Sequence, residues 1–271
     1  MMQSVPPRQP SAFPATAQTK TAHCDRHGPY ESMNYLGSRW TSCYHCGEET
    51  AAKESNLADH SRADRITEYL AASGIPDRFR DRTLDGYTVD PARQKQAAVL
   101  AFCRQYVERF DEVSKSGKGI IFHGTEGTGK THLACAIGLS VLRRYALPVT
   151  FTSVQQAMRR IKATWDTNTQ NRTESETFVI AAFSGVSLLI LDEVGIQHGS
   201  ATEQALLFGI LNTRYDARRP TIFLSNFSLD QISRLLTPPI MGRIEEDGGR
   251  IFHMDWPSHR RQPVTLKPTG G

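Results

Sequence analysis

The feature that most restricts the fold of this chain is GTEGTGKT at residues 124–131, a glycine-rich loop that ends in lysine and threonine. A short apolar run, KGIIFHG, leads into it, and a helical pattern, HLACAIGLSVLRRY, follows it. Between a strand and a helix, such a loop is typical of phosphate binding, because its backbone N–H groups and the positive end of the helix surround an anion. The pattern therefore predicts an ATP site at Gly124, Thr125, Glu126, Gly127, Thr128, Gly129, Lys130 and Thr131.

A second motif, SLLILDEVG at 187–195, places two carboxylates directly after a fully apolar strand. Beside a phosphate loop, these groups suit phosphoryl transfer to water. We expect Lys130 to reach the β and γ phosphates. Asp192 is expected to hold Mg²⁺ together with the Thr131 hydroxyl, and Glu193 to polarise the attacking water.

The strand PTIFLSN at 220–226 ends in a polar amide, Asn226. Ligands of parallel sheets collect at the carboxyl ends of the strands, so Asn226 is predicted to orient the water or to sense the γ-phosphate. The alternative is that Asn226 caps the helix that follows.

Apolar strands alternate with helical patterns along most of the chain. The predicted strands are 118–124, 148–153, 187–192, 220–226 and 250–256. Such alternation predicts an α/β P-loop domain with a central five-stranded parallel sheet that is covered on both faces.

Near the N-terminus, two closely spaced pairs of metal-binding residues are separated by fifteen residues, enough for a hairpin. Two such pairs let four ligands converge on one zinc ion, which would be structural because no coordination position stays open. The predicted ligands are Cys24, His27, Cys43 and Cys46. Free thiols or a disulfide are the alternatives, and His23 and His45 are rival ligands.

Composition and motif order give the expected organisation of the chain. The predicted segments are a disordered arm (1–20), a zinc module (21–50), a helical connector (51–73), the ATPase domain (74–260) and a flexible tail (261–271). No apolar run is long enough for a membrane span, so we expect a cytoplasmic protein. The net charge of +4 neither requires nor excludes nucleic acid.

Taken together, GTEGTGKTHLA, LLILDEVGIQ, YDARRPTIFLSN, IMGRIEEDGG and DWPSHR resemble the DnaC/IstB group of AAA+ ATPases, over roughly residues 74–260. The resemblance is greatest to its DnaC-type replicative helicase loaders. It implies an ATPase domain with Walker A and B motifs and no C-terminal lid. It also implies a ring or spiral of subunits that binds a hexameric helicase and single-stranded DNA in replication initiation.

The resemblance also assigns roles to individual residues. Arg243 matches the arginine finger that acts in a neighbour's site, and Arg260 matches the second sensor arginine. A guanidinium suits transition-state charge on the γ-phosphate, although either residue could also be an ordinary surface arginine. Without a lid, Ile75 and Phe79 become candidates for the adenine side of the site.

The family carries a helical insertion before its Mg²⁺-binding strand, and here that region contains a basic and aromatic cluster. Its members are Arg159, Arg160, Lys162 and Trp165. Cations with a stacking ring can hold single-stranded DNA, and the alternative is a solvated helix face with Trp165 packed on the core.

These observations favour ATP as an assembly and release switch of a helicase loader, with slow, DNA-stimulated hydrolysis. Two other functions stay open. One is a transposition helper ATPase of the IstB type that assembles on duplex DNA. The other is a zinc-containing DNA-binding adaptor whose ATPase is regulatory.

Overall fold

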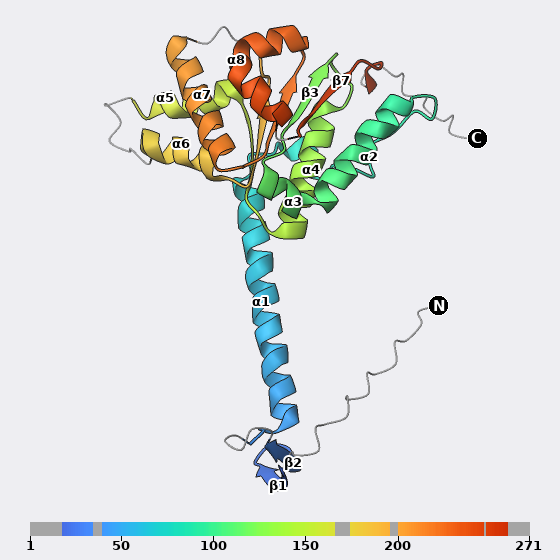
Figure 1. Cartoon of the computed structure of the whole chain (residues 1–271), viewed down its shortest axis with the longest axis vertical. Coiled ribbons are helices and arrows are strands. Elements are labelled where there is room, and N and C mark those ends of the chain that lie inside the picture. Colours follow the sequence, from blue (N-terminus) through green and yellow to red (C-terminus); the bar gives the residue numbers. More distant parts are fainter. Residues whose placement is uncertain (1–17, 35–39, 166–173, 196–199, 247, 260–271) are drawn as a thin grey trace, which may run out of the picture. The chain divides into compact units, whose positions relative to one another are not determined.

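A computed structural model describes residues 18–34, 40–165, 174–195, 200–246 and 248–259. The chain divides into two compact units, residues 1–63 and residues 64–271. The first unit contains a two-stranded antiparallel sheet, and the second contains a five-stranded parallel sheet (Figure 1).

The first unit is built on a β-hairpin of β1 (Gln18–Cys24) and β2 (Gly28–Asn34), which pair along their whole length. The first pair of predicted ligands, Cys24 and His27, lies at the turn of this hairpin. The sequence spacing had instead placed a hairpin in the fifteen residues between the two pairs. Helix α1 (Tyr44–Ala72) begins within the second pair. Regular structure therefore reaches into residues 18–20 of the predicted arm, and the predicted connector helix starts several residues early, inside the predicted zinc module.

The strands of the second unit are β3 (Ile120–Gly124), β4 (Val149–Ser153), β5 (Leu188–Asp192), β6 (Thr221–Ser225) and β7 (Arg250–Met254). They form one sheet in the order β4-β5-β6-β3-β7, with every neighbouring pair parallel. The predicted α/β fold with five parallel strands is confirmed. Since the order reverses beside β3, the carboxyl ends of β3, β5 and β6 meet at one edge, where α/β sheets bind ligands.

Helices cover both faces of this sheet (Figure 1). Their bounds are η1 Asp77–Phe79, α2 Gln94–Glu108, α3 Phe110–Ser116, α4 Lys130–Tyr145, α5 Val154–Ala163, α6 Glu176–Gly185, α7 Ala201–Asp216 and α8 Leu229–Glu246. Alternate β3 residues separate the two cores: Ile120 and Phe122 pack with α2, α3 and α4, while Ile121 packs with α5 to α8. This period of two is what a strand buried on both faces requires.

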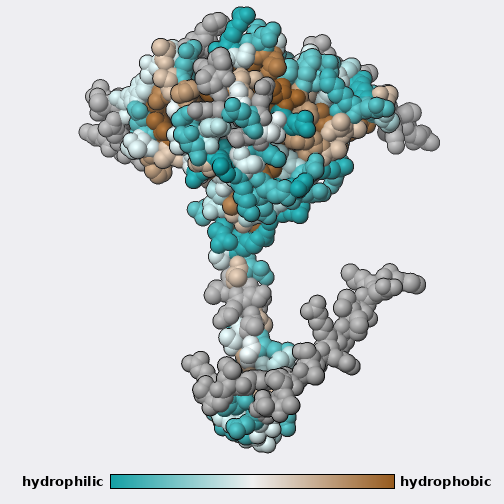
Figure 2. Space-filling view, in the orientation of Figure 1, coloured by the Kyte–Doolittle hydropathy of each residue, from teal (hydrophilic) through white to brown (hydrophobic). Residues whose placement is uncertain are grey.

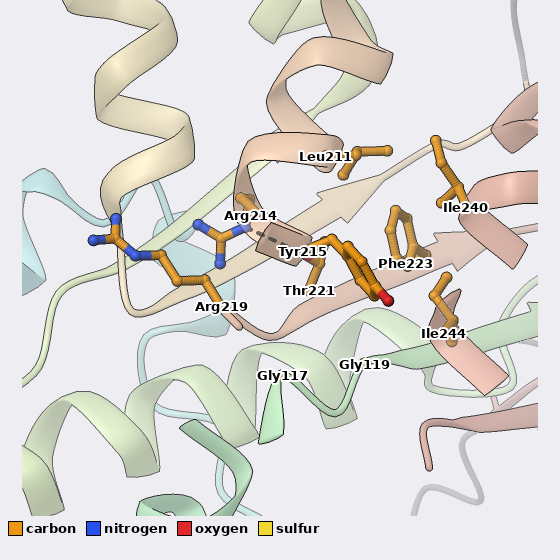
Figure 3. A pocket seen from close by; sticks show the side chains of 10 residues that line it. All are labelled: Gly117, Gly119, Leu211, Arg214, Tyr215, Arg219, Thr221, Phe223, Ile240 and Ile244. Atoms are coloured by element: carbon orange, nitrogen blue, oxygen red, sulfur yellow. Dashed lines mark hydrogen bonds between the residues drawn. The ribbon is translucent and has the colours of Figure 1, made fainter. Parts of the chain in front are cut away.

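At the amino edge of the sheet, opposite the glycine-rich loop, a hollow is lined by residues of α7, α8 and the starts of two strands. Figure 3 shows Arg214 and Arg219 on one side of it and apolar side chains on the other. Arg214 is 1% exposed, and its guanidinium donates to four carbonyl oxygens and to the Thr221 hydroxyl. It therefore ties the end of α7 to the start of β6 and to the C-terminal end of α6.

In the orientation of Figure 2 the surface is largely hydrophilic, and apolar side chains gather only in small patches. Within the part of the chain that the structure describes, no helix combines the length and apolar character needed to cross a membrane.

Candidate functional site: a nucleotide loop and a metal cluster

The glycine-rich loop connects β3 to α4 at the carboxyl edge of the sheet. Gly124, Gly127 and Gly129 have φ values of +125°, +78° and +93°, a region that residues with a Cβ seldom adopt. Among the described residues, none accepts a hydrogen bond from the backbone N–H groups of residues 126–129. These groups, next to the N-terminus of α4, form a cradle for a phosphate.

Lys130, the first residue of α4, is 7% exposed and folds back over the loop. Its Nζ donates to the carbonyl oxygens of Gly124 at 2.8 Å and Thr125 at 2.7 Å. The ammonium thus lies within the loop that would hold the phosphates, where its charge opposes theirs.

The predicted magnesium ligands lie together at the carboxyl edge of the sheet, where Thr131 follows Lys130 at the start of α4 and Asp192 ends β5. The Thr131 hydroxyl donates to Asp192 Oδ2 at 3.4 Å, and the backbone N–H of Glu193 donates to Asp192 Oδ1 at 2.7 Å. Burial raises the pKa of the Asp192 carboxyl, because it removes water from the charged form. Hard oxygen donors of this kind suit Mg²⁺.

Glu193 is exposed and has φ +58°, the left-handed region that a non-glycine residue adopts at a cost. Such backbone strain is concentrated at functional sites. Val194 N–H donates to Leu224 O, and the Ser225 hydroxyl donates to Val194 O, so the loop after β5 is fixed to the end of β6.

Asn226 follows β6, the strand between β5 and β3, and its Nδ2 donates to Glu126 Oε1 at 3.4 Å. The structure therefore brings Asn226 to the glycine-rich loop. In the described residues its side chain makes no capping bond to α8; Ser228 instead accepts from the Gln231 N–H. The sensor role stays a prediction.

Of the other predicted nucleotide contacts, the structure describes the side chains of Ile75 and Phe79 but not those of Arg243 and Arg260. Ile75 is 1% exposed and belongs to the core beneath α4. Phe79 is half-buried, with the Arg78 guanidinium 4.8 Å from its ring centroid. Arg243 lies in α8 with its side chain outside the described atoms, and Arg260 lies outside the described residues.

The predicted DNA-binding cluster is largely paired with acids of the same chain. Arg160 binds Glu174, and Lys162 Nζ lies 2.7 Å from Glu203. Trp165 is 43% exposed, and its indole N–H donates to a carboxylate, that of Glu176. Any DNA contact here must compete with these pairs, and it stays a prediction.

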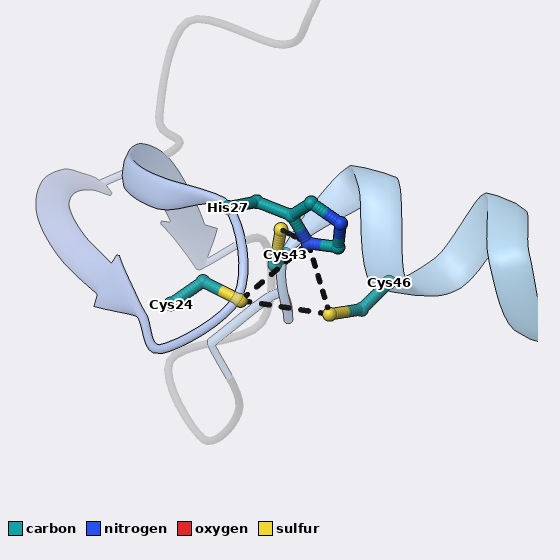
Figure 4. A group of neighbouring side chains, drawn as sticks. All are labelled: Cys24, His27, Cys43 and Cys46. Atoms are coloured by element: carbon teal, nitrogen blue, oxygen red, sulfur yellow. Dashed lines mark hydrogen bonds between the residues drawn. The ribbon is translucent and has the colours of Figure 1, made fainter.

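The four predicted zinc ligands converge in the first unit (Figure 4). Cys24 Sγ lies 3.5 Å from Cys46 Sγ, and His27 Nδ1 lies 3.7, 3.6 and 3.4 Å from the sulfurs of Cys24, Cys43 and Cys46. A tetrahedral zinc ion places neighbouring N and S ligand atoms roughly 3.5–3.8 Å apart. The donor set and its spacing therefore fit zinc.

The surroundings of this cluster fit the same assignment. Backbone N–H groups of Arg26 and His27 lower the pKa of the Cys24 thiol to about 6, while the contact with Cys24 raises the pKa of the Cys46 thiol to about 11, so this pair favours one thiolate, at Cys24. His27 directs Nδ1 at the sulfurs, while its Nε2 lies 3.1 Å from Glu49 Oε1. A carboxylate behind a ligand histidine is a common way to orient it. The rival His45 instead lies 3.6 Å from Glu48.

Several residues at the metal cluster and at the glycine-rich loop were not predicted from the sequence. Glu49 lies one helical turn after Cys46, a spacing that could have indicated it. Tyr87 and Trp256 both donate to the Thr128 carbonyl, and Ser258 packs on Gly127. Trp256 and Ser258 stand in the DWPSHR motif, but no local signal pointed to Tyr87.

Fold and site together define an AAA+ P-loop ATP-binding protein that carries a small zinc-type module. The sequence pattern of the family described as IstB-like ATP binding protein matches residues 53–252. The chain belongs to this family.

Curated relatives agree with that assignment. The chain is 32% identical to the Escherichia coli K12 replicative helicase loader DnaC over 213 residues, which cover 79% of this chain and 83% of DnaC. It is 30% identical to the uncharacterized protein YdaV of the same organism, with 77% and 79% covered.

Solved structures show the same fold. The DnaC helicase loader crystal structure matches with a TM-score of 0.57 at 23% identity, covering 66% of this chain and all of that one. The DnaI crystal structure matches with a TM-score of 0.54 at 25% identity, covering 68% and 94%.

Proposed function

We propose that this protein is an ATP-dependent loader of a replicative DNA helicase onto single-stranded DNA. The observation that carries the proposal is the 32% identity to a replicative helicase loader over about four fifths of both chains. The P-loop, Asp192 and Glu193 lie together in a geometry suited to ATP. Nucleotide binding is therefore expected to be part of the activity.

The chain's own residues divide the work of hydrolysis. Lys130 and the loop N–H groups hold the phosphates, Thr131 and Asp192 would hold Mg²⁺, and Glu193 accepts a proton from the attacking water. Mg²⁺ held by Thr131 and Asp192 would neutralise negative charge on the phosphates. Asn226, next to Glu126, orients that water or detects the γ-phosphate.

ATP acts in this proposal as a switch for assembly and release. Arg243 completes the site of a neighbouring copy, and Arg260 acts in the site of its own copy. The subunits form an ATP-dependent ring or spiral on the hexameric helicase and the DNA. Hydrolysis is slow in the isolated chain and rises with single-stranded DNA, because the site is complete only in the assembly.

The first unit binds Zn²⁺ through Cys24, His27, Cys43 and Cys46. With four protein ligands the ion has no open position, so it stabilises the fold of this unit and does no chemistry.

The switch is tested with Glu193→Gln, which keeps the side chain's size and removes its charge. The variant should accumulate as an assembly with ATP and single-stranded DNA, while Lys130→Ala should stay unassembled. Analytical ultracentrifugation measures both. A Glu193→Gln protein that remains a monomer with ATP and DNA contradicts the switch.

A second function is favoured by the family itself, which is described as IstB-like. A transposition helper of that type would assemble on duplex DNA. When duplex DNA is tested in parallel with single-stranded DNA, ATP-dependent filaments on the duplex, and none on single strands, would select this alternative.

A further inference from the structure

The glycine-rich loop is held from behind by two segments distant from it in the sequence. One is Tyr87, which precedes α2. The other is residues 256–259, directly after β7, here termed the C-terminal strap. Both lie against the outer side of the loop, and both belong to the second unit.

Two successive carbonyl groups of the loop are fixed by these segments. Thr128 O accepts from the Tyr87 hydroxyl at 2.8 Å and from the Trp256 indole N–H at 2.8 Å. Gly127 O accepts from the His259 backbone N–H at 2.9 Å. Tyr87 and Trp256 are 8% and 7% exposed, so water competes little for either bond.

The same segments also explain two of the glycines. A Cβ on Gly127 would lie 1.8 Å from the Ser258 hydroxyl oxygen, and a Cβ on Gly129 would lie 2.5 Å from the Tyr87 ring. The loop is thus packed against the strap and against Tyr87 as well as hydrogen-bonded to them. Tyr87 is itself fixed by α2, because Gln96 Nε2 donates to its oxygen at 3.4 Å and to Thr88 O at 3.2 Å.

Peptide planarity links these carbonyls to the phosphate cradle. In a trans peptide the C=O and the following N–H point in opposite directions. Fixing Gly127 O therefore directs Thr128 N–H to the other side, and fixing Thr128 O does the same for Gly129 N–H. These are two of the N–H groups that find no acceptor within the described residues.

We propose that Tyr87 and Trp256 are positioning residues for nucleotide phosphates. They act by fixing the peptide group between Thr128 and Gly129, so that the Gly129 N–H faces the bound anion. The inference rests on ATP binding at the P-loop, and it is independent of helicase loading. It also makes nucleotide binding and strap docking mutually dependent: a nucleotide that uses the oriented N–H groups stabilises the strap that leads to Arg260.

The test is a double-mutant cycle on ADP affinity with Tyr87→Phe and Trp256→Phe in the full-length protein, by isothermal titration calorimetry. Each single variant leaves one donor on the carbonyl, so we expect affinity to fall about threefold. The double variant loses both donors and should fall about 30-fold, more than the product of the singles. The ³¹P resonance of the ADP β-phosphate should shift in the double variant.

Tyr106→Phe is the matched control. Tyr106 is 4% exposed, against 8% for Tyr87, and donates to Lys118 O at 2.8 Å, just before β3 and away from the loop. It should lower the thermal unfolding midpoint as much as Tyr87→Phe does, while ADP affinity stays unchanged. Wild-type affinity in the double variant would overturn the inference, as would an equal loss in Tyr106→Phe.

A further variant separates this inference from the proposed function. If Lys130→Ala bound ADP like the wild type, nucleotide binding at the P-loop would fail, and the positioning role would fall with it. A protein that binds ADP as expected but loads no helicase would refute only the loader function.

Discussion

The two units of this chain build their sites in opposite ways. In the second unit, a five-stranded sheet with a core on each face holds the glycine-rich loop, and the loop is shaped by protein groups alone. In the first unit, the only buried side chains among described residues 18–34 and 40–50 are Ser32, Asn34 and Cys43. Packing therefore makes the nucleotide site, whereas the metal ligands must make the fold around them.

Because the two units depend on different interactions, changes in one should have little effect on the other. A change at the metal cluster should unfold the first unit without weakening nucleotide binding. A change in the core of the second unit should destabilise that unit and weaken nucleotide binding, while the first unit stays folded. A change in one unit that strongly altered the stability or binding of the other would contradict this separation.

Zinc removal gives the largest expected effect. Binding to a four-ligand structural site contributes on the order of 10 kcal/mol, more than a hairpin without a core can supply. A chelator should therefore abolish hydrogen-exchange protection in β1 and β2. ADP affinity should stay unchanged, and a parallel loss of ADP binding would contradict the separation of the two units. Cys43→Ser should give the same pattern.

Next in size is Arg214→Met. Removing this buried guanidinium takes a donor from four carbonyl oxygens, of which Ser184 O keeps a bond from Arg219 and Pro220 O one from the Leu189 N–H. The loss should lower the free energy of unfolding of the second unit by about 3 kcal/mol. Urea denaturation measures it, with the exposed neighbour Arg218→Met as the control. Protection of β1 and β2 should not change. Equal stability of the two variants would show that Arg214 is not needed to tie α7 to the sheet.

Lys130→Ala should weaken ATP binding about 100-fold, since it removes the charge-assisted contacts to the phosphates. Fluorescence titration with a labelled nucleotide measures this loss. Zinc content should remain at one ion per chain, because the variant lies in the other unit. Binding within a few-fold of the wild type would place the nucleotide elsewhere.

Glu49→Gln should have the smallest effect, a loss of zinc affinity of about tenfold, because Glu49 orients His27 but does not bind the metal. Competition with a chromogenic chelator measures it. Glu48→Gln, one residue away and exposed, is the control and should leave the affinity unchanged. If both variants lost affinity equally, local charge and not the His27 contact would be the cause.

Much of the fold and of both sites could be predicted from local patterns. Apolar strands, the glycine loop and the paired Cys and His residues each depend on a few neighbouring positions, and topology then brought Thr131, Asp192 and Asn226 to one edge of the sheet. The predicted helix after Gly129 and the strand before Asp192 lie where the motifs placed them.

What local patterns could not provide were contacts between distant segments. Trp256 donates to a carbonyl 128 positions earlier, and the Tyr87 hydroxyl to one 41 positions later. Neither partner is recognisable before the sheet is assembled. The sequence alone does not show that Arg160 and Lys162 on α5 are paired, because the acids that bind them, Glu174 and Glu203, lie outside that helix.

The most direct test of the central claim is the mass of the complex that this protein forms with a replicative helicase. Size-exclusion chromatography with light scattering should be run with the full chain and the hexameric helicase, with and without ATP, and with Lys130→Ala as the control. The loader function predicts a complex at the mass of a whole helicase hexamer plus loader, which changes with ATP in the wild type and does not in Lys130→Ala. Separate elution of the two proteins under every condition would contradict it.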